Sequence, residues 1–348
     1  MKGKIVFETG EIIEGCNLSG FRGKKIGRII FDTRVVGYEK ILTCPEYQDK
    51  LVVFSYPLIG NYGINREDLE TGDVFPSAII ISEVSSVYSN FRAYSSLEDF
   101  LSGTEVAVAE GADTRQLTCR IRDNKDLWAA IVPCDGDPGN IVAEIKAKKD
   151  SAKMRVPAIP ASEKTQDSPH AGKPYISVLN LGLKNSEMSF LRSSGFPLKM
   201  VVPGSEHAEE VISSAAAVYI TSGPDNLATI DKARRLIEKH TGKIPLCGAG
   251  LGHIIAGMAM GGEISGVSVN HYGVNHPVFD SLTKGYLVTE QSHSLVLNAD
   301  TLSAGQVRYV NLNDETVEGL YDAGMKVATV SFCPREEDFE NFFSLIKG

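Results

Sequence analysis

The hydrophobic pattern of residues 243–262 predicts a strand, a very tight turn and a helix in direct succession. Residues 244–247 form a short apolar run typical of a buried strand, and Gly248, Gly250 and Gly252 follow. The next run is apolar and rich in alanine and methionine, which indicates a buried helix. This succession is typical of a nucleophile elbow, whose central residue is a Ser or Cys on a strained turn. The central residue here is Gly250, which has no side chain for that chemistry.

The pattern differs between the two halves of the chain. Over residues 1–150, short strands alternate with turns, and the apolar runs beside Thr9 and Gly10 predict a hairpin. Two further apolar runs, residues 27–32 and 51–55, predict buried strands. Residues 151–173 are polar and contain several prolines, which predicts a linker.

Residues 174–348 begin with repeated strand–helix units. Apolar runs at 176–180, 198–203 and 217–221 predict strands, and residues 226–240 have the pattern of an amphipathic helix. Such repeats imply a parallel sheet with helices on both faces, and ligands of such sheets bind at the carboxyl ends of the strands. Further segments predict three more strands and a last helix: 285–289, 308–312, 327–332 and 336–346.

Composition excludes several classes of function. The formal net charge of the 348 residues is -9, so nucleic-acid binding has no electrostatic support. The sequence shows no signal peptide and no apolar run of 18 residues, so we expect no membrane partner. Its six cysteines are scattered without close pairs, which indicates a reducing, cytoplasmic environment with neither a disulfide framework nor a zinc site.

Motifs along nearly the whole length resemble the small, glutaminase subunit of carbamoyl-phosphate synthetase. The matching segments are 37–38, 41–43, 56–63, 89–92, 113–115, 223–224, 251–253, 273, 275–278, 293 and 310–319. The first five lie in the half that is specific to this subunit. The resemblance therefore implies an α/β protein with two domains: a subunit-specific domain over 1–150 and, over 174–348, a doubly wound domain of the class I glutamine amidotransferase type.

In that family, an elbow Cys attacks the carboxamide of glutamine, and a His backed by a Glu transfers the proton. The chemistry requires a thiolate, a nearby base and backbone amides for the oxyanion. Ammonia then passes to the large subunit, which uses ATP and bicarbonate. The resemblance places the nucleophile on Gly250, the base on Cys333 and the orienting carboxylate on Arg335. All three functional groups are missing, so we predict that the chain is a pseudoenzyme.

The resemblance also locates the glutamine pocket, and most of its residues have changed. The vestigial pocket positions are Glu46, Gly223, Asp225, Leu251, Ile254, Ser292, Ser294 and Leu295. Only Gly223 and Leu251 keep the family residue. The three new charges, Glu46, Asp225 and Arg335, allow two interpretations. They form either a new pocket for a small molecule, with Arg335 binding an anion, or a collapsed cavity with internal ion pairs, which we favour.

Other residues have simpler interpretations. Cys333 as a relocated nucleophile would need a base that the sequence does not supply, and Cys247 is expected in the core. Lys184 matches a lysine-containing loop of the family and is expected to serve packing or the subunit interface. The spacing of His253, His271, His276 and His293 fits no metal motif, so we predict neither a metal nor another cofactor.

The main hypothesis is a non-hydrolytic scaffold for a synthetase large subunit or a paralogue of it. Carbamoyl phosphate, a precursor in pyrimidine and arginine synthesis, would then form with free ammonia. The family supplies a precedent, because its ammonia-dependent members keep the amidotransferase domain after losing the nucleophile. The alternative is a binding or regulatory module with a small-molecule pocket at the old glutamine site. Because Cys333 and Arg335 supply no base, we expect Gly250→Cys alone not to restore hydrolysis.

Overall fold

The chain folds into two compact units, Met1–Met154 and Arg155–Gly348. Helix α4 (Pro138–Ala152) continues two residues into the predicted linker, and residues 153–173 lie outside the described residues. The predicted last helix also lies mostly outside them. The computed structural model describes residues 1–21, 23–124, 126–135, 138–152, 174–303, 306–335, 337, 338, 340, 343 and 346.

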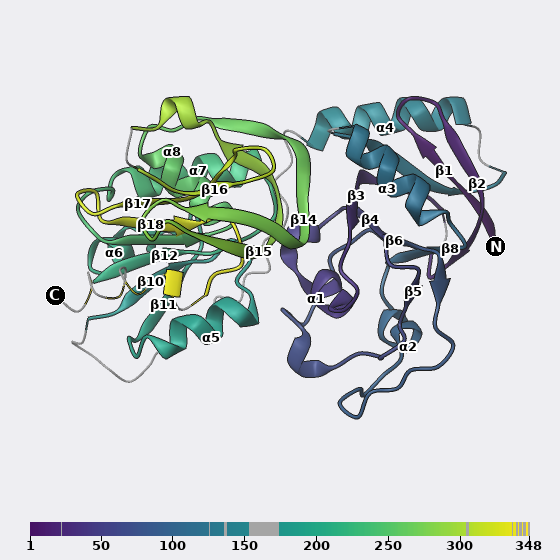
Figure 1. The fold of residues 1–348 in the computed structure, drawn as a ribbon, viewed down its shortest axis with the longest axis horizontal. Coiled ribbons are helices and arrows are strands. Elements are labelled where there is room, and N and C mark those ends of the chain that lie inside the picture. The colour runs from purple at the N-terminus through teal and green to yellow at the C-terminus, as the bar shows by residue number, and fades with distance from the viewer. Residues whose placement is uncertain are drawn as a thin grey trace. The chain divides into compact units, whose positions relative to one another are not determined.

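A closed barrel forms the first unit (Figure 1). The strand order is β1 (Lys2–Phe7), β2 (Ile12–Ser19), β8 (Ala107–Glu110), β6 (Ala78–Ile81), β4 (Leu51–Phe54), β3 (Lys25–Asp32) and β9 (Trp128–Pro133). Strands β3, β4, β6 and β8 are parallel neighbours, and the remaining pairs of the barrel are antiparallel. The predicted β1–β2 hairpin and the predicted strands β3 and β4 are confirmed.

Alternate residues of β1 serve two hydrophobic cores. Ile5 and Phe7 belong to one core cluster, whereas Val6 joins Ile141 and Ile145 of α4 in another. The two isoleucines are four residues apart, so they lie on one face of the helix. Burial of both faces explains why residues 5–7 of β1 are consecutive apolar residues rather than alternating with polar ones. Shorter elements complete the unit: α1 (Tyr38–Thr43), η1 (Pro45–Tyr47), β5 (Leu58–Ile59), η2 (Arg66–Asp68), β7 (Glu83–Val84), α2 (Leu97–Leu101) and α3 (Thr114–Asp123).

A nine-stranded mixed sheet organises the second unit. Its order is β11 (Leu198–Val201), β10 (Ile176–Leu179), β12 (Ala217–Ile220), β13 (Leu246–Ala249), β18 (Val327–Val330), β17 (Val317–Asp322), β15 (Gly285–Leu297), β14 (Ile264–Asp280) and β16 (Val307–Asn311). Neighbours from β11 to β18 are parallel, and those beyond are antiparallel. The predicted parallel sheet is therefore confirmed for its first part only. Direct hairpins replace helical crossovers after α8, which forces neighbouring strands into opposite directions.

Helices cover both faces of the parallel part. They are α5 (Asn185–Ser193), α6 (Ala208–Ser213), α7 (Leu227–Glu238) and α8 (Leu251–Ala259), and a short η3 (Ala299–Thr301) follows later. Val218 and Ile220 of β12 pack in the core with α6, α7 and α8, whereas Ala217 and Tyr219 pack with α5 on the other face. Figure 1 shows α7 and α8 on one side of the sheet and α5 on the other. This arrangement confirms the predicted doubly wound architecture.

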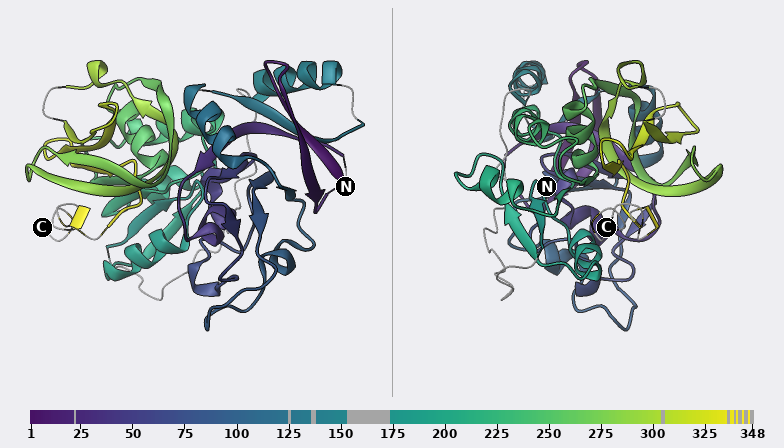
Figure 2. Two further views of the ribbon diagram at one scale, coloured as in Figure 1. Left: turned by 45° about the vertical axis from the view of Figure 1, so that its right-hand side comes forward. Right: turned by 90° about the vertical axis from the view of Figure 1, so that its left-hand side faces the viewer.

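Strands β14 and β15 form a long, curved hairpin, which Figure 2 shows in green. The register of β14 shifts twice, between Gly266 and His271 and between Gly273 and His276. Such bulges change which side chains share a face of the sheet. Among the described residues, no helix is both long and apolar enough to cross a membrane.

Candidate functional site

The predicted elbow is present at Gly250, between β13 and α8. Gly250 has φ 52° and ψ -115°, a combination that L residues rarely adopt. Its N–H donates to the carbonyl oxygen of Val330 at 2.9 Å, which ties the turn to the end of β18. The turn therefore lies at the carboxyl ends of two parallel strands, where ligands bind in sheets of this kind.

The space at Gly250 is closed by the loop that follows β12. A Cβ atom placed on Gly250 would lie 2.9 Å from the Cβ of Ser222, closer than real Cβ contacts. Ser222 is held in place because its N–H and its Oγ both donate to the carboxylate of Glu187 at 2.9 Å. Glu187 is fully buried at the start of α5 and also accepts a bond from Tyr219. The loop is thus anchored, and any side chain at Gly250 would have to displace it.

Sequence reasoning missed Glu187, although it singled out the neighbouring Lys184. Lys184 is the buried N-cap of α5, and its N–H donates to Glu187 at 3.2 Å. A Glu three residues after a helix N-cap is the pattern of a capping box, which could have pointed to Glu187. Its contacts with Ser222 could not be found this way, because they join segments 35 residues apart.

Arg335, which the sequence predicts at the position of the orienting carboxylate, contacts Asp338. Its Nε and Nη2 lie 3.1 and 3.0 Å from the two carboxylate oxygens, and its N–H donates to Oδ2 at 3.0 Å. Asp338 is 2% exposed and also accepts a bond from Tyr309. Cys333, which the sequence predicts at the position of the base, is half-buried, and its N–H donates to the carbonyl of Glu290. The described contacts of Arg335 and Cys333 are therefore with other residues of the protein that support the local structure.

The structure joins two of the vestigial pocket positions directly. The Oγ of Ser294 on β15 donates to the Asp225 carboxylate at 2.5 Å. Leu251 and Ile254 are both 3% exposed and belong to the hydrophobic core. Of these predicted pocket positions, two are thus bonded to each other and two pack in the core.

The remaining pocket positions have local explanations. Gly223 is required by packing, since a Cβ there would lie 2.5 Å from the carbonyl oxygen of Leu181. Ser292 and Leu295 are half-buried on β15, and Leu295 packs against the core. Glu46 belongs to the first unit, where it is 5% exposed and accepts a bond from Cys44 Sγ at 2.7 Å. The prediction that Cys247 is a core residue is confirmed, because it is fully buried.

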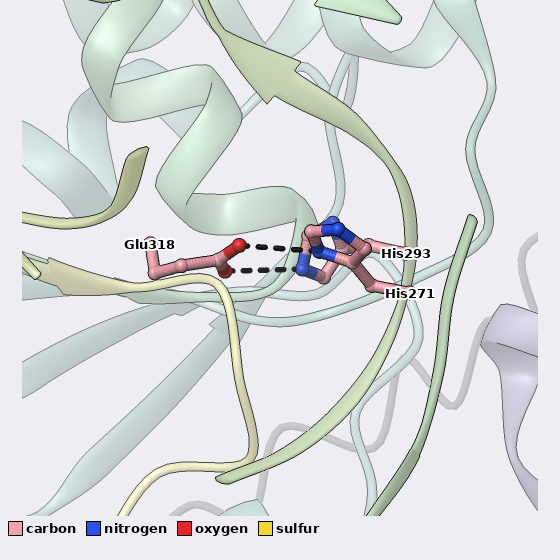
Figure 3. Close-up of side chains that lie close together, drawn as sticks. All are labelled: His271, His293 and Glu318. Atoms are coloured by element: carbon pink, nitrogen blue, oxygen red, sulfur yellow. Dashed lines mark hydrogen bonds and ion pairs between the residues drawn. The ribbon is translucent and has the colours of Figure 1, made fainter. Parts of the chain in front are cut away.

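A second polar cluster lies in the antiparallel part of the sheet, and the sequence did not predict it. His271 and His293 face each other across β14 and β15, and Glu318 extends toward both from β17 (Figure 3). The carboxylate oxygens of Glu318 lie 3.2 Å from His271 Nδ1 and 3.2 Å from His293 Nε2. Asp314 accepts a bond from His271 Nε2 at 2.9 Å.

Charges within this cluster shift the pKa values of its members. Burial acts to lower the pKa of His271, but its contacts with Asp314 and Glu318 outweigh burial and raise the pKa to about 9. Burial would raise the pKa of Glu318, but the two histidines hold it well below the usual range. Burial and the neighbouring His271 lower the pKa of His276 to about 4. Without a bound ion, the cluster therefore pairs a charged His271 with two carboxylates at neutral pH.

Comparisons with known proteins cover both units. The family model described as carbamoyl-phosphate synthase small chain, CPSase domain, matches residues 5–131, and the glutamine amidotransferase class-I model matches residues 178–335. A carbamoyl phosphate synthase small chain from Nitratidesulfovibrio vulgaris is 32% identical over 370 residues, covering 100% of this chain and 98% of the relative. The chain belongs to the carbamoyl-phosphate synthase small-chain family.

Other members of the family give the same coverage. The carbamoyl phosphate synthase small chain of Clostridium perfringens is 32% identical and covers 99% of this chain and 98% of its own length. The protein of that name from Bacillus cereus is 32% identical, and the match covers 100% of this chain and 97% of the relative. The family matches also contain the predicted pocket positions: Glu46 lies in the first match, and the others lie in the second.

Solved structures resemble about half of the chain more distantly. A candidate GMP synthase component from Thermoplasma acidophilum has a TM-score of 0.44 at 14% identity, covering 51% of this chain and 96% of that chain. A glutamine amidotransferase from Thermotoga maritima has a TM-score of 0.38 at 13% identity, and the match covers 50% of this chain and 82% of that chain. At this level of similarity, nothing about activity can be transferred to the chain.

Proposed function

We propose that this small-chain family member does not hydrolyse glutamine and acts instead as the structural partner of a synthetase large subunit. Gly250 is the observation that carries the proposal. It occupies the apex of the elbow, where covalent catalysis requires a nucleophilic side chain. Backbone amides alone could stabilise an oxyanion, but they could not form the thioester through which the family reaction proceeds.

The surroundings of Gly250 support the loss of hydrolysis. The Arg335 side chain is paired with Asp338, and Asp225 is bonded to Ser294, so neither charge is directed to a substrate by its described contacts. Ile254 lies in the hydrophobic core. These contacts also favour a filled pocket over a new small-molecule site, which was the alternative hypothesis from the sequence.

A partner surface is supported by the apolar segment 87–94 of the first unit. Phe91 is 96% exposed and Val87 is 76% exposed, and Tyr88 and Tyr94 add partly exposed rings. Exposed aromatic side chains in one short segment are typical of protein–protein contact sites. The segment includes residues 89–92, which match the family motif, so it would be expected to contact a large subunit.

The reaction that remains would use free ammonia. The large subunit would join ammonia to bicarbonate with ATP, and this chain would stabilise that subunit without delivering ammonia from glutamine. Carbamoyl phosphate synthesis would then require ammonium and would be unaffected by glutamine. The assignment to pyrimidine or arginine synthesis rests only on carbamoyl phosphate being a precursor in both pathways.

The proposal is tested by reconstituting the chain with the synthetase large subunit from the same cell. Carbamoyl phosphate formation is measured with ammonium and, separately, with glutamine, and glutamate release is measured in parallel. We expect a stable complex, synthesis with ammonium only and no glutamate above the level that the large subunit gives by itself. Glutamate release that depends on this chain would overturn the proposal, and its loss in Cys333→Ala would assign that activity to Cys333.

Absence of a complex would refute the partner role. In that case, thermal-shift measurements with glutamine, glutamate and other small carboxylates would test the alternative of a repurposed pocket. A shift that Asp225→Ala or Arg335→Met abolishes would favour that alternative.

A further inference from the structure

We propose that His271, His293 and Glu318 form a binding site for a divalent transition-metal ion of the zinc type. These three residues offer two imidazole nitrogens and a carboxylate oxygen within 4.8 Å of one another. Two histidines and a glutamate are a ligand set that zinc accepts in proteins. The site lies in the antiparallel part of the sheet, and His293 stands on β15 between the predicted pocket positions Ser292 and Ser294.

The distances in the cluster suit a tetrahedral ion. Zinc lies about 2.0–2.2 Å from nitrogen and oxygen ligands, so two ligand atoms of a tetrahedral site lie about 3.4 Å apart. The two nitrogen–oxygen separations in the cluster are each 3.2 Å, one to Glu318 Oε1 and the other to Glu318 Oε2. An ion among the three side chains would draw the two nitrogens, which now lie within 4.8 Å of a shared carboxylate oxygen, closer together.

Hydrogen bonding within the cluster is incomplete in a way that an ion would remedy. His271 Nδ1 lies beside Glu318 Oε1, but it makes no hydrogen bond of acceptable geometry among the described residues, and it is the nitrogen that an ion would bind. All three side chains are at most 8% exposed, so bulk water does not satisfy this nitrogen. Buried polar atoms without partners are uncommon and point to an unseen water or ion.

A second layer of contacts orients the ligands as in known metal sites. Asp314 accepts a bond from His271 Nε2, which leaves Nδ1 as the nitrogen with a lone pair when the ring is neutral. A carboxylate behind a metal-bound histidine is the usual arrangement around protein-bound zinc. Thr316 Oγ1 lies 2.8 Å from the Asp314 carboxylate and 2.9 Å from the Glu318 carboxylate, so its single hydroxyl proton can be donated to either group.

Charge and rigidity also favour an ion. Glu318 and Asp314 carry two negative charges, which a divalent cation would neutralise without protonation of His271. The three ligands belong to three strands of one sheet, β14, β15 and β17, so their backbones hold the site in place. Because the ligands are buried, we assign the ion a structural role: it would cross-link the hairpin to β17.

The test uses the full chain after dialysis against a chelator, with Zn²⁺ alone as the probe. Cys119 and Cys134 are exposed thiols that could hold zinc without a built site, so both are replaced by serine in every variant. Metal content is measured after gel filtration, and Co²⁺ is substituted to record the visible spectrum. We expect one Zn²⁺ per chain, a raised thermal midpoint and a Co²⁺ spectrum of tetrahedral type.

Two ligand variants and one neighbour decide the assignment. Glu318→Gln and His293→Asn should each lose the bound ion, whereas His276→Asn should keep one equivalent. His276 is a suitable control because its ring lies 5.1 Å from that of His271 but it is not one of the three ligands. Failure of the parent with Cys119 and Cys134 replaced to retain Zn²⁺, or equal retention by all variants, would overturn the proposal. If the ligand variants do not fold, the Co²⁺ spectrum of the parent decides between nitrogen and oxygen ligation and adventitious binding.

Discussion

The elbow at Gly250 and the cluster around Glu318 lie in the same unit, but they differ in their polar side chains. At the elbow, the catalytic position has no side chain, and its neighbours are bonded to one another or lie in the core. At the cluster, Glu318 contacts His271, His293, Ser331 and Thr316, and it is fully buried.

This difference indicates which polar side chains can be replaced without destabilising the fold. A catalytic group is oriented for a substrate, so its replacement by an apolar residue leaves few protein atoms unpaired. A buried carboxylate that pairs with two histidines cannot be removed alone, because its partners would stay buried without it. Five predictions test this contrast, starting with the largest effect.

Removal of Glu318 should be the most destabilising of these changes. Glu318→Ala would leave a charged His271 and a buried His293 without their carboxylate, and we expect a loss of about 3–5 kcal/mol in the free energy of unfolding. Chemical denaturation measures the loss. Glu263→Ala, at an exposed position, serves as the control and should change stability by less than about 0.5 kcal/mol. A similar, small loss for both variants would contradict the structural role of the cluster.

Stability should fall on the alkaline side because of His271. Its folded pKa of about 9 lies above its ordinary value of 6.5, so its contribution is complete below about pH 6.5 and is lost as the pH rises to about 9. The full contribution is at most about 3 kcal/mol, from 1.36 kcal/mol per pKa unit. Denaturation curves from pH 6 to 9 with chelator present should show this fall, and His271→Asn should flatten it.

Stability at acidic pH should depend more on His276 than on His271. The folded pKa of His276 is about 4, below its ordinary value, so its contribution is present above about pH 6.5 and is lost as the pH falls toward 4. His276→Asn should therefore flatten the acidic limb, whereas His271→Asn, which removes the smaller cause of the lowered pKa, should weaken it only in part. An alkaline limb that is unchanged in His271→Asn would show that other groups control it.

Gly250→Cys should be destabilised without gaining activity. The backbone φ of 52° and the close approach of Ser222 should together cost about 1–3 kcal/mol. Gly261→Cys is a matched control, because Gly261 also has a positive φ but its Cβ would meet nothing within 4 Å. We expect a larger loss at Gly250 than at Gly261 and no glutamate release. Glutamine hydrolysis by the single mutant would show that the remaining site is still competent.

Arg335→Met should have the smallest effect. The Arg335 side chain is 41% exposed, so its pairing with Asp338 is partly screened, and we expect a loss of about 1 kcal/mol. Ammonia-dependent synthesis should stay unchanged. Arg235→Met, which removes a more exposed ion pair, is the control and should be close to neutral. A large fall in synthesis for Arg335→Met alone would indicate a functional role at this position.

Local patterns predicted the parts of the fold that depend on neighbours in sequence. The strand–turn–helix succession at Gly250 is visible in the chain because apolar runs and glycines determine it over a few residues. The parallel part of the sheet followed from repeated strand–helix units in the same way. The family motifs placed Cys333 and Arg335 at the old site, but the pairing of Arg335 with Asp338 was found only in the structure.

The sequence by itself determined that the elbow has no nucleophile, because identity at one position decides that question. Only the tertiary structure decided that His271, His293 and Glu318 meet, since they come from three strands and their spacing follows no local period. The shift in register between Gly273 and His276 shows the physical reason. In a regular strand, residues 271 and 276 would face opposite sides, whereas the bulge brings their rings within 5.1 Å. Sites of this kind depend on the pairing of strands that are far apart in sequence, and hydrogen bonds between the strands determine that pairing.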